Sequence, residues 1–398
     1  MSNSRTDATN AVHVGRRPKQ NFGAVNPPVY HASTILYPTL QALRDSRKIA
    51  PGDGVTYGVH GTPGTYAFEE AVRALEGGFR TRLCSTGLTA CTAPMLAYLQ
   101  SGDHVLVTDS VYGPTRRFCG GTLKRMGITT TFYDPLIGGG IRDLMQPNTK
   151  LVFVEAPGSW TFEVQDIPAI AEEAHKAGAI VMMDNTWASP LYFKPFEHGV
   201  DVSVQAITKY VAGHSDLVMG SVTTTEAAYP AMRDQWADLG LNGAPDDVFL
   251  AMRGIRTLHT RLPRHWENGL KVAEWLMSRD EVAEVIHPAM PHDPGHAIWK
   301  RDFRGASSLF AFTLKDERSN EAQLAALLDD LELFGMGYSW GGFESLLIPV
   351  NPELLRTATP WPKPGRPTGQ TMRIHVGLED PDDLIADLSA GFARMAAV

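Results

Sequence analysis

Apolar runs of strand length alternate with helical stretches through the middle of this 398-residue chain, and the alternation restricts the folds open to it. The strand-like runs lie at residues 104–108, 129–133, 151–155, 180–184 and 202–207. Helices are predicted between them at residues 88–100, 115–126 and 167–176. Apolar strands that alternate with helices form a parallel sheet covered on both faces. We therefore expect an α/β fold that binds its ligand at the carboxyl ends of the strands.

Three segments of the chain differ in composition. Residues 1–60 are polar at first and then rich in Pro and Gly, which predicts an irregular arm that either stays loose or packs on something else, with a neighbouring subunit as one candidate. Residues 61–252 hold the strand and helix alternation, after a helix at 65–76. Residues 253–398 predict a smaller α+β domain. Its expected helices are 253–277, interrupted at Pro263, 321–331 and one from Asp380, and its expected strands are 308–314 and 371–376.

Composition excludes several classes of protein. The hydrophobic share of 43% and charged share of 20% are ordinary for a globular protein, and a net charge of −8 argues against a nucleic-acid partner. The apolar runs are too short to span a membrane, and residues 1–12 lack a secretory signal, so we expect a cytoplasmic location. The cysteines show no metal spacing, and His287, His292 and His296 are interpreted as surface loop residues, so no metal site is expected.

Two of the predicted strands end on side chains suited to cofactor chemistry. The run 180–184 ends on Asp184, and the run 202–207 is followed by Thr208 and Lys209. A lysine in apolar surroundings has a lowered pKa and can form a Schiff base. An acid opposite it can keep a pyridine nitrogen protonated, as pyridoxal 5'-phosphate (PLP) chemistry requires. The alternatives are an aspartate that caps the next helix and a lysine that is a solvated surface charge.

Other residues around this pair fit the same chemistry. Gly87 precedes a helix, whose first amides can bind a phosphate, although a plain Ser/Thr cap is the competing explanation. Thr208 could add a hydrogen bond to that phosphate. Tyr112 follows a strand closely enough to stack on a pyridine ring, although most tyrosines fill cores. Arg373 stands in an apolar strand pattern, which indicates either a substrate carboxylate or a structural salt bridge as its partner.

The chain resembles the PLP-dependent enzymes of cysteine and methionine metabolism, which have the fold of type I PLP enzymes. The motifs that carry the resemblance cover almost the whole chain and are Tyr57…Gly61-Thr62-Pro63, Leu75-Glu76-Gly77-Gly78, Ser85-Thr86-Gly87, Gly102-Asp103-His104-Val105, Glu155-Ala156-Pro157-Gly158-Ser159, Asp184-Asn185-Thr186, Thr208-Lys209-Tyr210, Gly213-His214-Ser215-Asp216 and Ser339-Trp340-Gly341-Gly342. The resemblance implies a mainly parallel seven-stranded sheet between helices in a PLP-binding domain, residues 61–252, and a smaller C-terminal domain. It also implies a homotetramer of two active dimers that acts on an amino acid.

The resemblance assigns roles to individual residues. Lys209 would carry PLP, Asp184 would bind the pyridine nitrogen, and Tyr112 would stack on the ring. The other implied cofactor contacts are Gly87, Leu88, Thr208 and, from the neighbouring subunit, Tyr57. The implied substrate contacts are Tyr338, Ser339, Trp340 and Arg373, with the arginine on the α-carboxylate.

Within the family, the residues favour the branch that cleaves cystathionine by β-elimination in methionine biosynthesis. The γ-acting members commonly have Leu where Trp340 stands, although a γ-lyase, a γ-synthase or a cysteine-S-conjugate lyase remains the alternative. Val59 departs from the family, which usually has a phosphate-binding arginine there; His60 comes next and could partly substitute. Ser159 replaces a common asparagine, and the β-eliminating branch tolerates this serine.

Overall fold

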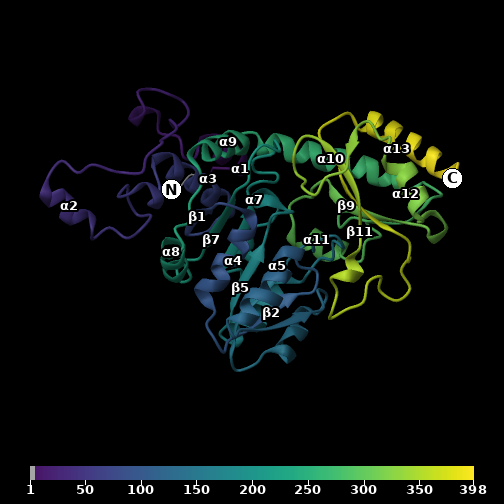
Figure 1. Ribbon diagram of the computed structural model, residues 1–398, viewed down its shortest axis with the longest axis horizontal. Coiled ribbons are helices and arrows are strands. Elements are labelled where there is room, and N and C mark those ends of the chain that lie inside the picture. Colours follow the sequence, from purple (N-terminus) through teal and green to yellow (C-terminus); the bar gives the residue numbers. More distant parts are fainter. Residues whose placement is uncertain (1–4) are drawn as a thin grey trace.

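The computed structural model describes residues 5–398, which form two sheets joined by a long helix (Figure 1). The larger sheet has seven strands in the order β1-β7-β6-β5-β4-β2-β3. Their bounds are β1 Arg80–Cys84, β2 His104–Thr108, β3 Thr129–Tyr133, β4 Thr149–Glu155, β5 Ile180–Asp184, β6 Val202–Ala206 and β7 Gly220–Thr224. Only β7 runs antiparallel to its neighbours in this sheet. The predicted fold class, a mainly parallel seven-stranded sheet with a second, smaller domain, is confirmed.

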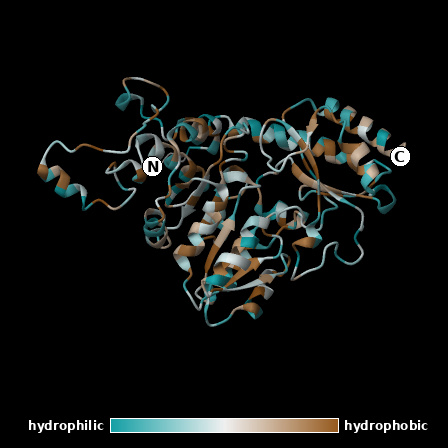
Figure 2. Cartoon of the chain, viewed as in Figure 1, coloured by the Kyte–Doolittle hydropathy of each residue, from teal (hydrophilic) through white to brown (hydrophobic). Residues whose placement is uncertain are grey.

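Helices cover both faces of the larger sheet. Val152 and Val154 of β4 belong to one apolar cluster, which includes residues of α6, whereas Leu151 and Phe153 belong to the other, which includes residues of α4. Alternate residues of a strand point to opposite faces, so β4 is buried on both. Figure 2 shows brown, hydrophobic strands at the centre of this layered part. The helices of this part are α3 Pro63–Glu76, α4 Gly87–Tyr98, α5 Gly113–Phe118, α6 Ile167–Lys176, α7 Ser189–Tyr192, α8 Tyr229–Asp238 and α9 Pro245–Ile255.

The smaller sheet has the order β10-β11-β12-β9-β8. Its strands are β8 Val282–Ile286, β9 Leu309–Leu314, β10 Phe334–Gly335, β11 Ser345–Val350 and β12 Thr371–His375. The helices that follow α9 are α10 Leu258–Met277, α11 His296–Asp302, α12 Glu321–Leu328 and α13 Pro381–Ala396. Apolar residues of α10, α12 and α13 pack on this sheet in one cluster. Short helical turns are η3 Cys119–Leu123, η4 Gly138–Leu144, η5 Pro195–His198, η6 Asp316–Arg318 and η7 Pro352–Leu354.

Two local predictions are wrong. Helix α10 continues through Pro263. The helical stretch is interrupted instead between Ile255, where α9 ends, and Leu258, where α10 begins. Proline removes one helical hydrogen bond, and the buried face of α10, which includes Leu262 and Leu276, holds the helix together despite that loss. His287 is fully buried rather than on the surface, because its ring packs against Phe310 and its Nδ1 accepts a hydrogen bond from the backbone amide of Ala289.

The N-terminal segment packs on α3 through its first helix, where Ala11 is fully buried, and extends away from the two sheets further along the chain (Figure 1, purple). It contains α1 Asp7–His13, η1 Pro18–Gln20, α2 Leu40–Ser46 and η2 Gly58–His60, and α2 buries none of its residues. Apolar side chains are exposed along it, among them Phe22, Leu36 and Leu40. Among residues 5–398, no helix combines the length and apolarity that crossing a bilayer needs.

Candidate active site

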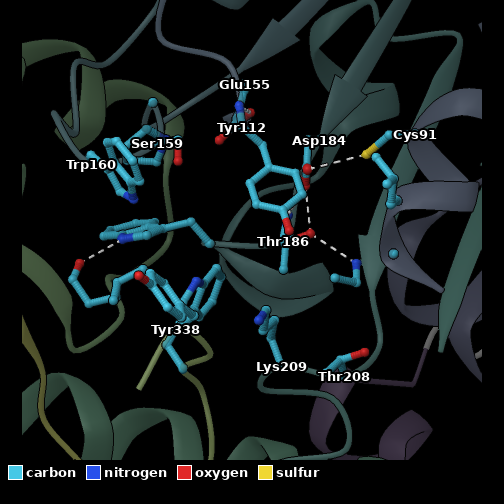
Figure 3. Close-up of a pocket in the computed structure, with 18 of the residues that line it drawn as sticks. Cys91, Tyr112, Glu155, Ser159, Trp160, Asp184, Thr186, Thr208, Lys209 and Tyr338 are labelled. Carbon is cyan, nitrogen blue, oxygen red and sulfur yellow. Dashed lines mark hydrogen bonds between the residues drawn. The ribbon is translucent and has the colours of Figure 1, made fainter. Parts of the chain in front are cut away.

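A cavity of about 250 Å³ lies at the carboxyl edge of the larger sheet, where residues that follow β4, β5 and β6 meet loops from the smaller sheet (Figure 3). Its lining consists of Thr86, Gly87, Leu88, Cys91, Tyr112, Glu155, Pro157, Gly158, Ser159, Trp160, Phe162, Asp184, Thr186, Trp187, Ala206, Thr208, Lys209, Val218, Leu309, Tyr338, Trp340 and Arg373. Most of the site residues predicted from the sequence are therefore brought together here.

Asp184 ends β5 and is oriented by three donors. The backbone amide and Oγ1 of Thr186 donate to Asp184 Oδ1 at 3.0 and 2.5 Å. The thiol of Cys91 on α4 donates to Asp184 Oδ2 at 3.6 Å. Burial raises the pKa of Asp184, while these bonds and Lys209 lower it. The carboxylate is thus fixed in one orientation at the cavity wall, as a partner for a cationic ring nitrogen must be.

Lys209 follows β6 and reaches the opposite side of the cavity. Its Nζ donates to Ser339 Oγ at 2.8 Å and lies 5.2 Å from the centre of the Trp340 ring. Burial lowers the pKa of Lys209 to about 8, and the charge of Arg373 adds to this effect. An amine with that pKa is largely neutral slightly above pH 8, and only the neutral amine is a nucleophile or base.

Arg373 lies on β12 and is 6% exposed. Its guanidinium donates to the backbone carbonyls of Tyr338 at 3.0 Å, Gly337 at 2.8 Å and Ser339 at 3.1 Å. Burial lowers its pKa to about 10 against an opposing effect of Tyr112 and Tyr338, and no carboxylate of residues 5–398 contributes to that pKa. Arg373 therefore forms no salt bridge with the described residues. A carboxylate that enters the cavity could pair with its guanidinium.

Helix α4 begins at the cavity, where Gly87 allows the start of the helix to pack closely against Ala206 of β6. A Cβ on Gly87 would lie 2.7 Å from the Cβ of Ala206, so any larger residue would push α4 away from β6. Thr86 caps the helix by accepting a hydrogen bond from the amide of Thr89 at 2.9 Å. The amides of Gly87 and Leu88 come before the helical hydrogen bonds begin and are available to an anion.

Aromatic side chains form much of the remaining wall. Tyr112 is 43% exposed, and its backbone amide is held by Glu155 Oε2 at 2.7 Å. Tyr338 and Trp340 line the cavity from the loop before β11. Figure 3 shows the Tyr112 ring between Asp184 and the side of the cavity that carries Lys209 and Tyr338.

Comparison with known proteins identifies the family. The model of the family described as "Cys/Met metabolism PLP-dependent enzyme" matches residues 8–393. The chain belongs to this family.

Individual members of the Cys/Met metabolism family are similar over nearly their full length. The chain is 48% identical to a putative cystathionine β-lyase of Rhizobium johnstonii, over 98% of this chain and 96% of that protein. It is 43% identical to the cystathionine β-lyase of Escherichia coli K12, over 99% of this chain and 100% of that protein. The structure of the cystathionine γ-synthase from Xanthomonas oryzae, solved with aminoacrylate and cysteine, is 32% identical and superimposes with a TM-score of 0.88 over 99% of both chains. PLP is accordingly the cofactor.

The donors around the cavity fit PLP. A phosphate suits the open amides of Gly87 and Leu88, a pyridine nitrogen suits the oriented carboxylate of Asp184, and an aldehyde suits the amine of Lys209. Thr208 also lines the cavity, but its hydroxyl donates to the Met219 carbonyl at 3.1 Å and would have to turn to reach a phosphate.

Tyr57 and Ser339 are the predicted site residues outside the cavity lining. Ser339 still contacts Lys209, whereas Tyr57 lies beside η2 in the N-terminal segment and is 49% exposed. Sequence reasoning did not assign Cys91, Trp160, Phe162, Trp187 or Leu309 to the site. Trp160 and Phe162 could have been assigned to the site from the sequence, because they directly follow the Glu155–Ser159 motif. Cys91 and Leu309 could not have been assigned in this way, because each reads as an ordinary core residue.

Proposed function

We propose that this chain is a PLP-dependent carbon–sulfur lyase that cleaves L-cystathionine by β-elimination to homocysteine, pyruvate and ammonia, a step of methionine biosynthesis. The observation that carries the proposal is that Lys209, Asp184 and Arg373 line one cavity, with Tyr338 and Trp340 at its wall. The names of the Rhizobium and Escherichia relatives support the choice of substrate.

In this proposal the cofactor is held at four places. Lys209 would bind it covalently, Asp184 would accept a hydrogen bond from the protonated pyridine nitrogen, and Tyr112 would lie over the ring. Gly87 and Leu88 bind the phosphate through backbone amides, with Thr208 beside them. When bound, PLP withdraws electrons from the substrate carbon that carries the amino group, which makes the proton on that carbon acidic.

Once the substrate amine has replaced it on the cofactor, the freed Lys209 would move the proton. Its low pKa leaves a neutral amine near pH 8, and its position in the cavity allows Nζ to remove the proton from the substrate α-carbon. Ser339 Oγ lies 2.8 Å from Nζ and holds the amine in place. With the proton removed, the bond between the β-carbon and sulfur breaks and the thiolate departs.

Arg373 orients the substrate. Three backbone carbonyls fix its guanidinium, so the donors that remain can face the α-carboxylate of an amino acid. The partly buried ring of Trp340, which packs against Tyr210, would exclude water on its side of the departing sulfur, whereas Tyr338 is 88% exposed at the mouth of the cavity. We infer that this bulky wall favours β-elimination.

The active molecule in this proposal is a homotetramer of two active dimers, located in the cytoplasm. The support is the N-terminal segment, in which Phe22 is 108% and Leu36 88% exposed, because exposed apolar side chains mark interaction surfaces. Residues 1–60 would form an arm that brings Tyr57 to the phosphate of the neighbouring subunit. Residues 61–252 would form the PLP-binding domain and residues 253–398 the C-terminal domain.

A γ-acting enzyme is the second candidate, because the Xanthomonas γ-synthase structure superimposes with a TM-score of 0.88. Identifying the keto acid formed from L-cystathionine separates the two. β-Elimination gives pyruvate with homocysteine, whereas γ-elimination gives 2-oxobutyrate with cysteine. We expect pyruvate from the PLP-loaded protein and no keto acid from the Lys209→Ala variant. The formation of 2-oxobutyrate would overturn the β-lyase assignment.

A further inference from the structure

The thiol of Cys91 points into the cavity and is bonded to the carboxylate that we assign to the pyridine nitrogen. Cys91 lies on α4, is 2% exposed, and its Sγ is 3.6 Å from Asp184 Oδ2 (Figure 3). A sulfur donor at this distance makes a weak hydrogen bond. Burial and the neighbouring acids raise the pKa of the Cys91 thiol well above its ordinary value, so the sulfur keeps the proton that it donates.

The two oxygens of Asp184 have different partners. Both hydrogen bonds from Thr186 end on Oδ1, and the thiol of Cys91 ends on Oδ2. The other titratable groups that face this carboxylate are Lys209, Glu155, which is its register partner on β4, and Tyr112. Lys209 is the cation among them. Cys91 is thus the donor that fixes the second oxygen.

The other two cysteines differ from Cys91. Cys84 and Cys119 are also buried and free, but neither lines the cavity. The Sγ of Cys119 lies 3.9 Å from the sulfur of Met95, in an apolar cluster. Cys119 therefore serves as a matched control: a buried thiol of the same sheet face without contact to the site.

We propose that Cys91 is a positioning residue, whose S–H group holds Asp184 in the orientation that meets the pyridine nitrogen and lowers the basicity of its carboxylate. The proposal rests on the proposed contact between Asp184 and PLP. It does not depend on which sulfur amino acid the enzyme cleaves.

The first test is infrared spectroscopy of the S–H stretch in the PLP-loaded protein. Subtracting the spectrum of Cys91→Ser from that of the unchanged protein isolates the Cys91 band. We expect this band at a lower frequency than the Cys119 band, isolated in the same way with Cys119→Ser. In Asp184→Asn it should move to a higher frequency, because an amide is a weaker acceptor than a carboxylate. A Cys91 band that Asp184→Asn leaves unmoved would overturn the proposal.

The second test follows the visible absorption of bound PLP against pH. Cys91→Val removes the donor, so Asp184 becomes a stronger base and takes a larger share of the proton on the pyridine nitrogen. The ring then withdraws electron density less strongly. As a result, the Lys209 nitrogen that is bonded to PLP loses its proton at a higher pH. We expect this upward shift in Cys91→Val and Cys91→Ala, together with a kcat about five-fold lower. Cys91→Ser keeps a donor and should restore the original titration.

Cys119→Val controls for the loss of a buried thiol and should leave the titration unchanged. If Cys91→Val titrates like the unchanged protein, or if Cys119→Val shifts equally, the positioning role is wrong. Neither spectrum uses cystathionine, so an error in the proposed substrate leaves both tests valid. A protein that never acquires the PLP absorption would instead overturn the proposed function.

Discussion

Lys209 Nζ lies 2.8 Å from Ser339 Oγ, and this hydrogen bond joins the two halves of the site. Lys209 follows β6 of the larger sheet, whereas Ser339 lies in the loop between β10 and β11 of the smaller one. The same loop supplies the backbone carbonyls that hold Arg373. The lysine and the arginine are therefore positioned relative to one another by a single loop.

The pKa of Lys209 sets the pH dependence of cofactor capture. Burial lowers this pKa to about 8, so about half of the amine is neutral at that pH and about nine-tenths is neutral one pH unit higher. We expect the rate at which the cofactor-free protein captures PLP to rise with pH and level off above about pH 9, one unit above this pKa. Stopped-flow absorbance at a fixed PLP concentration measures this rate. A rate that still rises towards the pKa of an exposed lysine, about 10.4, would contradict the burial argument.

Arg373→Lys should weaken substrate binding more than catalysis. A lysine keeps the charge but lacks the planar group that bonds the carbonyls of Gly337, Tyr338 and Ser339 while facing a carboxylate. We expect KM to rise about 10- to 100-fold, because the loss of one charge-assisted hydrogen bond weakens binding by about that factor. The control is Arg366→Lys, since Arg366 pairs with Glu284 outside the cavity. Equal changes in the two variants would argue against a carboxylate contact at Arg373.

The larger sheet and most of the site followed from the sequence because their signals are local. Strands buried on both faces are continuous apolar runs, and Asp184 and Lys209 stand at the ends of two of them. β7 was not predicted, since its polar residues, including Thr223, hide the pattern. β11 was not predicted either, and Pro349 interrupts its apolar run. The partners of Arg373 are backbone carbonyls, which no side-chain pattern reveals. The contact of Cys91 with Asp184 joins residues 93 positions apart and depends on how α4 packs on the sheet.

Val59→Arg should tighten PLP binding. Val59 lies on η2 in the N-terminal segment, where the family usually has an arginine that reaches the phosphate of the neighbouring subunit. An added guanidinium beside a phosphate makes charge-assisted hydrogen bonds, so we expect the Kd for PLP to fall about 10-fold. Equilibrium dialysis of the cofactor-free protein measures the Kd. Val55→Arg, a change on the same segment away from η2, is the control, and an equal gain there would indicate nonspecific attraction.

Leu36→Asp should weaken self-association. Leu36 is 88% exposed on the N-terminal segment, and a charge at that position would have to be desolvated in an interface between subunits. Sedimentation velocity should show smaller species at low protein concentration for this variant. Leu354→Asp is the matched control, because Leu354 is 77% exposed on η7, away from that segment. Unchanged sedimentation of Leu36→Asp would argue against an arm that packs on a neighbouring subunit.

The account depends most on PLP being bound covalently through Lys209. Borohydride reduction of the PLP-loaded protein, followed by proteolysis and mass spectrometry, locates the lysine that carries the cofactor. We predict a pyridoxyl label on the peptide that contains Lys209 and none on other lysines, including the buried Lys194, which is bonded to the carbonyls of Leu75 and Pro190. A label on another lysine, or no label in a protein that binds PLP, would contradict the assignment of this cavity as the active site.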